Sequence, residues 1–140
     1  MISRRYLRTK VMQAIFAHEM NPTENIILAE KKLNTSIQDC YRLFLYFFSL
    51  FTELKSYHQK RLDELKQKNF PTYEDLHPNT KFLDNKVIAQ IENSRTLQIM
   101  YRDYKISWPE NTELIIQLFR KIAESEEFAG YMQNPERSYE

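Results

Sequence analysis

The sequence is poor in residues that interrupt helices, since its 140 residues include one glycine and five prolines. β-Sandwiches, β-barrels and glycine-rich phosphate loops need many more turn residues, so the composition argues against an all-β fold and a P-loop enzyme. A single cysteine, Cys40, excludes an internal disulfide. The length suits one compact core, and residues 1–140 are expected to form a single helical domain.

Long apolar runs are also missing. The densest stretch, residues 43–51, is only nine residues long, whereas a membrane-spanning helix needs about 18 or more. The first ten residues, MISRRYLRTK, lack the apolar run of a secretory signal. We therefore expect a cytoplasmic protein that is not associated with a membrane.

Helical spacing of apolar residues dominates what is present, and it predicts an all-α fold: a compact bundle of about five to six helices, with one long ordered loop near residues 70–85. The capping-box spacing of Thr35 and Gln38 predicts the start of a central helix that runs to about residue 65. Gly130 is expected to follow the end of a helix. The other predicted helices cover residues 3–20, 22–33, 87–100 and a segment that begins near 107–110, and Asn21, Pro22 and Glu24 are expected to open the second of these. The positions predicted to be buried include Phe44, Phe47, Phe48, Phe51 and Leu54 of the central helix and Leu114, Ile115, Leu118, Phe119 and Ile122 of the last segment.

Catalytic and metal-binding patterns are absent from the sequence. His18, His58 and His77 lie on different predicted elements without partners at ligand spacing, and Cys40 has no second cysteine. Neighbouring carboxylates fall in charged segments typical of a solvated surface. We therefore predict a protein that is not an enzyme and has no metal or other cofactor.

The charge is unevenly distributed although the chain as a whole is only +1. Residues 1–20 carry a net charge of +3, and residues 110–140 carry −4. Arg4 and Arg5 begin a predicted helix, where the helix dipole disfavours cations by a few tenths to about 1 kcal/mol each. A bound polyanion would remove this conflict, and the free amides of the helix end would add donors for phosphate. An ordinary basic terminus that aids solubility is the alternative interpretation.

Two aromatic residues lie close to these arginines. Tyr6 and Phe16 are placed away from the predicted packing stripe of the first helix, which contains Leu7, Val11 and Ala14. A nucleobase could stack on either ring, and a guanidinium group could cover it. Lys10 adds a further positive charge.

The first helix resembles the opening helix of NusB-type transcription antitermination factors. The resemblance rests on Arg4, Arg5 and Arg8, followed by the segment from Val11 through Phe16, VMQAIF, which matches an apolar pair and then Gln-Ala-Leu-Tyr. Tyr6 stands where family members often carry a further arginine. The segment that begins at Pro71 and includes PNTKF is similar to a longer branch of the family. The family's later asparagine-glycine signature is absent and the sequence ends at ERSYE without a capping signal, so we expect the amino-terminal part of a longer protein.

The resemblance implies a non-enzymatic RNA-binding protein that takes part in transcription antitermination. Such proteins recognise a single-stranded boxA element of the ribosomal RNA leader together with the small-subunit ribosomal protein that acts as NusE, and they reach the RNA polymerase elongation complex indirectly. Arg4, Arg5 and Arg8 are then phosphate or base contacts, with Phe16 at the matching aromatic position. Tyr6 and Lys10 complete the predicted RNA-binding set.

A helical protein–protein interaction module without RNA binding is the main alternative. Its basic first helix would meet an acidic protein, and the acidic segment from Glu110 onward would mediate self-association. The aromatic-rich central helix could also be buried in a homodimer. Salt dependence distinguishes the two functions, because about three phosphate contacts to a single strand give a log–log slope near −2, and rim charges of a protein interface give less.

Overall fold

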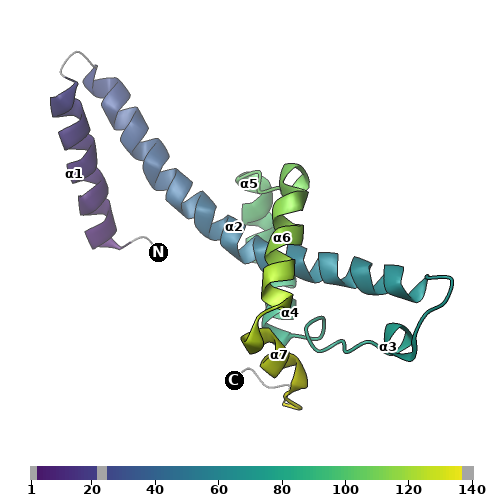
Figure 1. Cartoon of the computed structure of the whole chain (residues 1–140). Coiled ribbons are helices and arrows are strands. Elements are labelled where there is room, and N and C mark those ends of the chain that lie inside the picture. Colours follow the sequence, from purple (N-terminus) through teal and green to yellow (C-terminus); the bar gives the residue numbers. More distant parts are fainter. Residues whose placement is uncertain (1–2, 22–24, 137–140) are drawn as a thin grey trace. The chain divides into compact units, whose positions relative to one another are not determined.

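A computed structural model describes residues 3–21 and 25–136, and within these ranges the chain is helical and contains no strand. The predicted all-α fold class is confirmed. No helix in the described ranges has the length and apolar character needed to cross a membrane. The helices are α1 (Arg4–Met20), α2 (Ile26–Lys66), α3 (Tyr73–Leu76), α4 (Lys86–Glu92), α5 (Arg95–Asp103), the 3₁₀ turn η1 (Pro109–Asn111), α6 (Thr112–Ala123) and α7 (Glu126–Gln133) (Figure 1).

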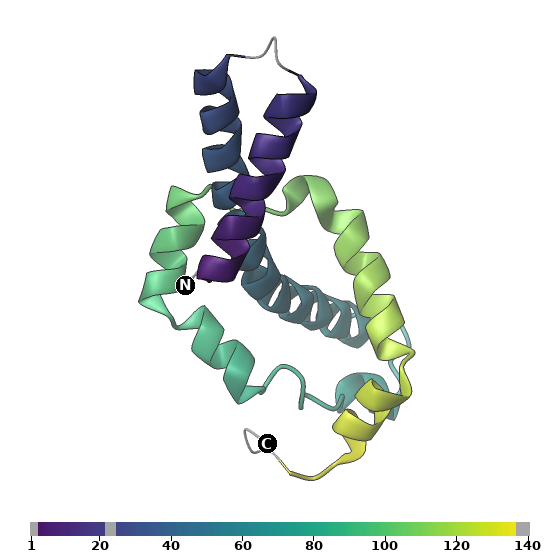
Figure 2. The same ribbon diagram turned by 90° about the vertical axis from the view of Figure 1, so that its left-hand side faces the viewer.

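The chain divides into two compact units, Met1–Tyr46 and Phe47–Glu140, and the boundary falls inside α2. The first unit is a helical hairpin in which α1 runs back along the first half of α2 (Figures 1 and 2). No side chain of α1 is buried. The expectation of a single domain stays a prediction.

The second unit builds its core between the second half of α2 and α6. Leu54, Ile115 and Phe119 are buried together, at 2–4% exposure. The Phe119 ring contacts Tyr57 edge-on and stacks on His58, with centroid separations of 5.3 and 5.0 Å. The predicted apolar spacing therefore places the core of this unit correctly, since Leu54 and the apolar face of α6 both came from it.

The first half of α2 differs from the prediction, which divided it into two helices. α2 is continuous over 41 residues, and Thr35 lies in its interior. The Thr35 hydroxyl donates to the carbonyl of Lys31 at 3.0 Å. It therefore makes its hydrogen bond to the preceding turn of the same helix and does not cap a new helix. Asn21, predicted to cap the second helix, instead ends α1 with its N–H on the carbonyl of His18. The predicted roles of Pro22 and Glu24 lie outside the described residues.

Three further details correct the sequence-based prediction. The predicted helix over residues 87–100 is divided into α4 and α5, because Ser94 caps α5 by accepting the N–H of Leu97. The loop near residues 70–85 contains α3, which opens with a capping box of Thr72 and Asp75. Gly130 lies inside α7 without a positive φ, so it does not end a helix.

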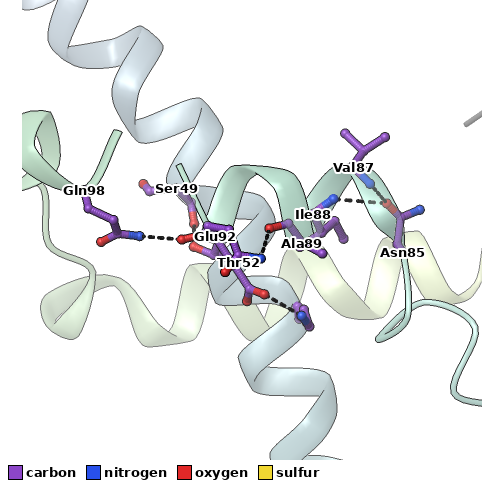
Figure 3. A network of polar contacts seen from close by, with 10 residues as sticks. Ser49, Thr52, Asn85, Val87, Ile88, Ala89, Glu92 and Gln98 are labelled. Atoms are coloured by element: carbon purple, nitrogen blue, oxygen red, sulfur yellow. Dashed lines mark hydrogen bonds and ion pairs between the residues drawn. The ribbon is translucent and has the colours of Figure 1, made fainter. Parts of the chain in front are cut away.

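Polar contacts join α2, α4 and α5 within the second unit (Figure 3). Asn85 caps α4 by accepting the N–H groups of Val87 and Ile88 at 2.9 and 3.1 Å. At the other end of α4, the Glu92 carbonyl accepts from Gln98 of α5 at 3.2 Å, and the Glu92 carboxylate pairs with Lys55 of α2 at 2.5 Å. These contacts fix both ends of α4.

A second set of polar contacts fastens the loop after α3 to the end of α7. Lys81 is only 7% exposed, and its Nζ donates to the carbonyls of Tyr131 and Asn134 at 2.6 and 2.5 Å. The same ammonium lies 4.5 Å from the centroid of the Tyr131 ring. Asn79 donates to the Met132 carbonyl at 2.9 Å. The last carbonyl groups of a helix have no donors within the helix, and here the loop supplies donors for them.

Candidate nucleic-acid interface

The candidate interface begins at the amino end of α1. Ser3 is the N-cap, and its hydroxyl accepts the N–H of Tyr6 at 3.2 Å. The first turn contains Arg4 and Arg5 and no acidic residue, so positive side chains lie at the positive end of the helix dipole. This arrangement is unfavourable for the isolated helix and favourable for a bound anion.

The three arginines share the side of α1 that faces away from α2. Arg4, Arg5 and Arg8 are exposed, and none of them forms an ion pair with another residue in the described part of the chain. Since Arg4 and Arg8 are one turn apart, their guanidinium groups can reach neighbouring phosphates of one strand.

Apolar side chains continue the same side of the helix beyond the arginines. Met12 is 70% exposed, Ile15 is 58% exposed and Phe16 is 64% exposed. The Phe16 ring is therefore open to stack on an unpaired base, as the sequence analysis expected. We call this side the outer face of α1, and it consists of Arg4, Arg5, Arg8, Met12, Ile15, Phe16 and Glu19, all of them exposed.

Two members of the predicted RNA-binding set lie elsewhere. The side chain of Tyr6 is hydrogen-bonded to Cys40 of α2, and this bond, with burial, raises the pKa of the Tyr6 phenol. The ammonium of Lys10 lies 5.7 Å from the Tyr6 ring centroid. Lys10 also lines a cavity of about 170 Å³ between the two helices, beside Leu33 and Ser36. The predicted placement of Tyr6 away from the packing side is therefore wrong, and Lys10 points to α2.

The packing side of α1 differs from the predicted stripe for a physical reason. Val11 and Ile15, which the apolar spacing places on the packing side, are exposed, whereas Leu7 and Ala14 of the same stripe are half-buried, together with Tyr6, Lys10 and His18. Small Ala14 allows the helices to approach, and the long stem of Lys10 covers apolar surface while its charge stays near water. The apolar spacing therefore predicts part of this side, Leu7 and Ala14, and leaves out Tyr6 and Lys10, because both side chains carry polar groups.

A cavity of about 650 Å³ lies in the second unit. Its lining includes Tyr57, Tyr101 and Trp108, with the Trp108 Nε1 donating to the buried Ser49 hydroxyl at 2.9 Å. Burial raises the pKa of Tyr101, whose hydroxyl oxygen lacks a hydrogen-bond partner among the described residues. Within the same residues, no group of three His, Cys, Asp or Glu side chains could hold a metal ion. This cavity could not be predicted from the sequence, because its walls come from segments that are far apart along the chain.

Comparisons with family models, curated proteins and solved structures find no match for this chain. The NusB-type resemblance of the first helix therefore stays a prediction, and the interface must be argued from its own residues.

Proposed function

We propose that this chain is a non-enzymatic RNA-binding protein of the NusB type, which acts in transcription antitermination. It binds a boxA-like single-stranded segment of the ribosomal RNA leader with the outer face of α1, together with a small-subunit ribosomal protein acting as NusE. The observation that carries the proposal is the set of three exposed arginines at the amino end of α1, where no first-turn acid offsets them.

The spacing of residues along α1 supports two separate roles, phosphate contact by the arginines and base stacking on Phe16. Arg4, Arg5 and Arg8 position the strand through its phosphates, a contact that carries no sequence information by itself. Phe16 lies 8 to 12 residues further on, which is about 12–18 Å along the helix. Stacking of an unpaired base on Phe16 then adds affinity of about 1–3 kcal/mol. The chain assembles a complex and turns over no substrate.

Fluorescence anisotropy with a short boxA-like RNA tests the proposal. The triple variant Arg4→Ala, Arg5→Ala, Arg8→Ala loses three charge-assisted contacts, and at about 1 kcal/mol each the affinity falls roughly 100-fold. The native chain gives a log–log salt slope near −2, and the triple variant gives a slope near zero.

A matched control removes three exposed positive charges from the second unit, with Arg95, Arg120 and Lys121 changed to Ala. This control has the same net charge as the arginine variant, so it separates local contacts from long-range attraction. Equal loss of affinity in the two triple variants, or no RNA affinity of the native chain at about 50 mM salt, contradicts the proposal.

The alternative function, a protein–protein interaction module, draws support from the apolar part of the outer face. Met12 and Ile15 are too exposed to serve the packing of the hairpin, and exposed apolar clusters mark contact surfaces. In this case Met12→Ser weakens capture of the partner protein and leaves RNA affinity nearly unchanged, and the triple arginine variant also weakens capture, because the partner expected for the basic helix is acidic. The RNA assay and a partner-binding assay on the same two variants distinguish the functions.

A further inference from the structure

The cavity of about 650 Å³ in the second unit has a polar wall along α2. The α2 residues that line it follow one another at intervals of one and three from Ser49 to Glu64, so they share one side of the helix. Hydroxyl groups and charges dominate this side, although it lies between α2 and two other helices, α5 and α6. The volume falls within the range of about 300–1,000 Å³ that is usual for small-molecule sites.

Three aromatic residues also line the cavity. The Trp108 Nε1 donates to the Ser49 hydroxyl at 2.9 Å, which fixes the edge of the indole ring. Tyr57 is held by its edge-on contact with Phe119, at a centroid separation of 5.3 Å. The buried hydroxyl of Tyr101 has no hydrogen-bond partner among the described residues, an unusual state for a buried polar group. These residues suit a planar ligand that also carries polar groups.

The wall that contains Tyr101 is formed by an unusual helix end. After α5, the N–H of Ile106 donates to the Tyr101 carbonyl at 2.8 Å, and the N–H of Lys105 donates to the Arg102 carbonyl at 3.2 Å. This is a Schellman motif, in which Lys105 has a φ of 52° at the position that glycine usually occupies. Ile106 and Tyr101 both line the cavity. A strained backbone position beside a cavity wall is typical of binding sites.

Charged groups of both signs flank the aromatic part of α2. Glu53 lies four residues before Tyr57, whereas Lys60 and Arg61 lie three and four residues after it. None of these three charged residues forms an ion pair with another described residue, and the Arg61 guanidinium lies 6.0 Å from the Phe119 ring centroid. Glu53 and Lys60 are about 10 Å apart along the helix axis. The cavity therefore has an acceptor before its aromatic rings and two cations after them.

We propose that this cavity binds a nucleoside monophosphate, with the base against Trp108 and Tyr57 and the phosphate on Lys60 and Arg61. Glu53 accepts a hydrogen bond from the amino group of the base. The walls favour a free nucleotide over one within an RNA strand, because Glu53 and Glu64 repel phosphates that continue past the two cations. The proposal concerns the second unit and is independent of RNA binding by α1.

Fluorescence titration of the full chain with AMP tests the proposal, since Trp108 is the only tryptophan of the sequence. We expect saturable quenching with a dissociation constant below about 1 mM. The double variant Lys60→Gln, Arg61→Gln loses the phosphate contacts, and its dissociation constant for AMP rises at least about tenfold. Adenosine, which has no phosphate, binds the native chain and this variant equally weakly.

The matched control is Lys66→Gln, Arg120→Gln, which removes two exposed cations outside the cavity lining and leaves AMP binding unchanged. The triple arginine variant of α1 also binds AMP as the native chain does, which separates this site from the proposed RNA contact. Helical circular dichroism confirms that each variant is folded.

A second comparison tests the role of Glu53. Purine riboside 5′-monophosphate differs from AMP in lacking the amino group, and we expect the native chain to bind it roughly fivefold more weakly. Glu53→Ala binds the two nucleotides equally, a result that a purely structural role of Glu53 does not produce.

Four results would overturn the proposal. These are the absence of saturable quenching by AMP up to about 5 mM, equal losses in the two double variants, adenosine binding as tightly as AMP, and a short single-stranded RNA that quenches Trp108 at lower concentration than AMP. The last result would assign the cavity to a nucleotide within a strand.

Discussion

Lys81 is the residue whose surroundings differ most from those usual for its type. Lysine is rarely buried, yet its ammonium here takes the place of the missing donors at the carboxyl end of α7, and the negative end of the helix dipole favours a cation at that point. The Tyr131 ring lies against the same ammonium, and the Tyr131 hydroxyl accepts from the side-chain amide of Asn85 at 3.0 Å. One side chain thus connects the loop after α3 with the last turn of the described fold.

Replacement of Lys81 by Met keeps the apolar stem and removes the donors. The carbonyls of Tyr131 and Asn134 then lose a charged partner, and we expect the free energy of unfolding to fall by about 1–3 kcal/mol in urea denaturation. Lys121→Met, at an exposed position of α6, serves as the control and changes the stability by less than about 0.5 kcal/mol. Equal stability of the two variants would show that the Lys81 contacts contribute nothing net.

His58 makes the stability of the second unit depend on pH. Burial, and to a lesser degree the charge of Arg61, lowers the pKa of this imidazole below its ordinary value of 6.5, and neither ring nitrogen has a hydrogen-bond partner among the described residues. The unfolded chain therefore takes up a proton more readily than the folded chain. The stabilisation is complete above about pH 6.5 and is lost as the pH falls from there through the lower pKa of the folded state.

Denaturation of the His58→Phe variant between pH 5 and 7.5 measures this contribution. The ring stack on Phe119 is retained, and we expect the variant to lose less stability than the native chain over the acidic part of the range. His77→Phe, at an exposed histidine, keeps the native pH dependence and is the control. An unchanged slope in His58→Phe would assign the acid sensitivity to other groups.

At the scale of the elements, periodic apolar spacing predicted the helices better than local capping signals did. Ile115 and Phe119 of α6 are buried as expected, because three to four residues in every two turns of an amphipathic helix face the core, whereas Leu114 is 45% exposed. Thr35 and Gln38 failed as a helix start because the spacing of a capping box also occurs by chance within a helix. The cap at Ser94 was not predicted, because the apolar spacing continues almost unbroken from α4 into α5. The break between the two helices therefore leaves little trace in the sequence pattern.

The charged residues of the candidate interface could be predicted from the sequence, but the side of α1 that packs on α2 could be predicted only in part. Arg4, Arg5, Arg8 and Phe16 are exposed on α1 as expected, because charged residues at a helix start stay in water regardless of packing. Tyr6 could not be placed from the sequence, because its partner Cys40 lies 34 residues away and on another helix. The aromatic residues Phe44 and Phe47 were predicted as core yet are 51% and 58% exposed, so apolar spacing overstated the burial of α2.

At the scale of the whole chain, the two units differ in how much they bury. The second unit has a core in which Leu54 and Phe119 are at most 3% exposed, whereas α1 in the first unit buries no side chain. α2 belongs to both units, since the boundary falls within it at Tyr46 and Phe47. The described buried core is therefore concentrated in the second unit, while in the first unit Leu45 of α2 is buried.

The lack of buried side chains in α1 has a consequence for amide hydrogen exchange. Few tertiary contacts oppose opening of this helix, so its amides exchange at rates near those of a fraying helix, while those around Ile115 and Phe119 exchange only on larger unfolding. Under the proposed function, RNA on the outer face would add its binding free energy to the closed helix, and we expect slower exchange over residues 4–20 when RNA is present. The exchange rate of α1 thus reports, without any label, the fraction of molecules whose outer face is occupied.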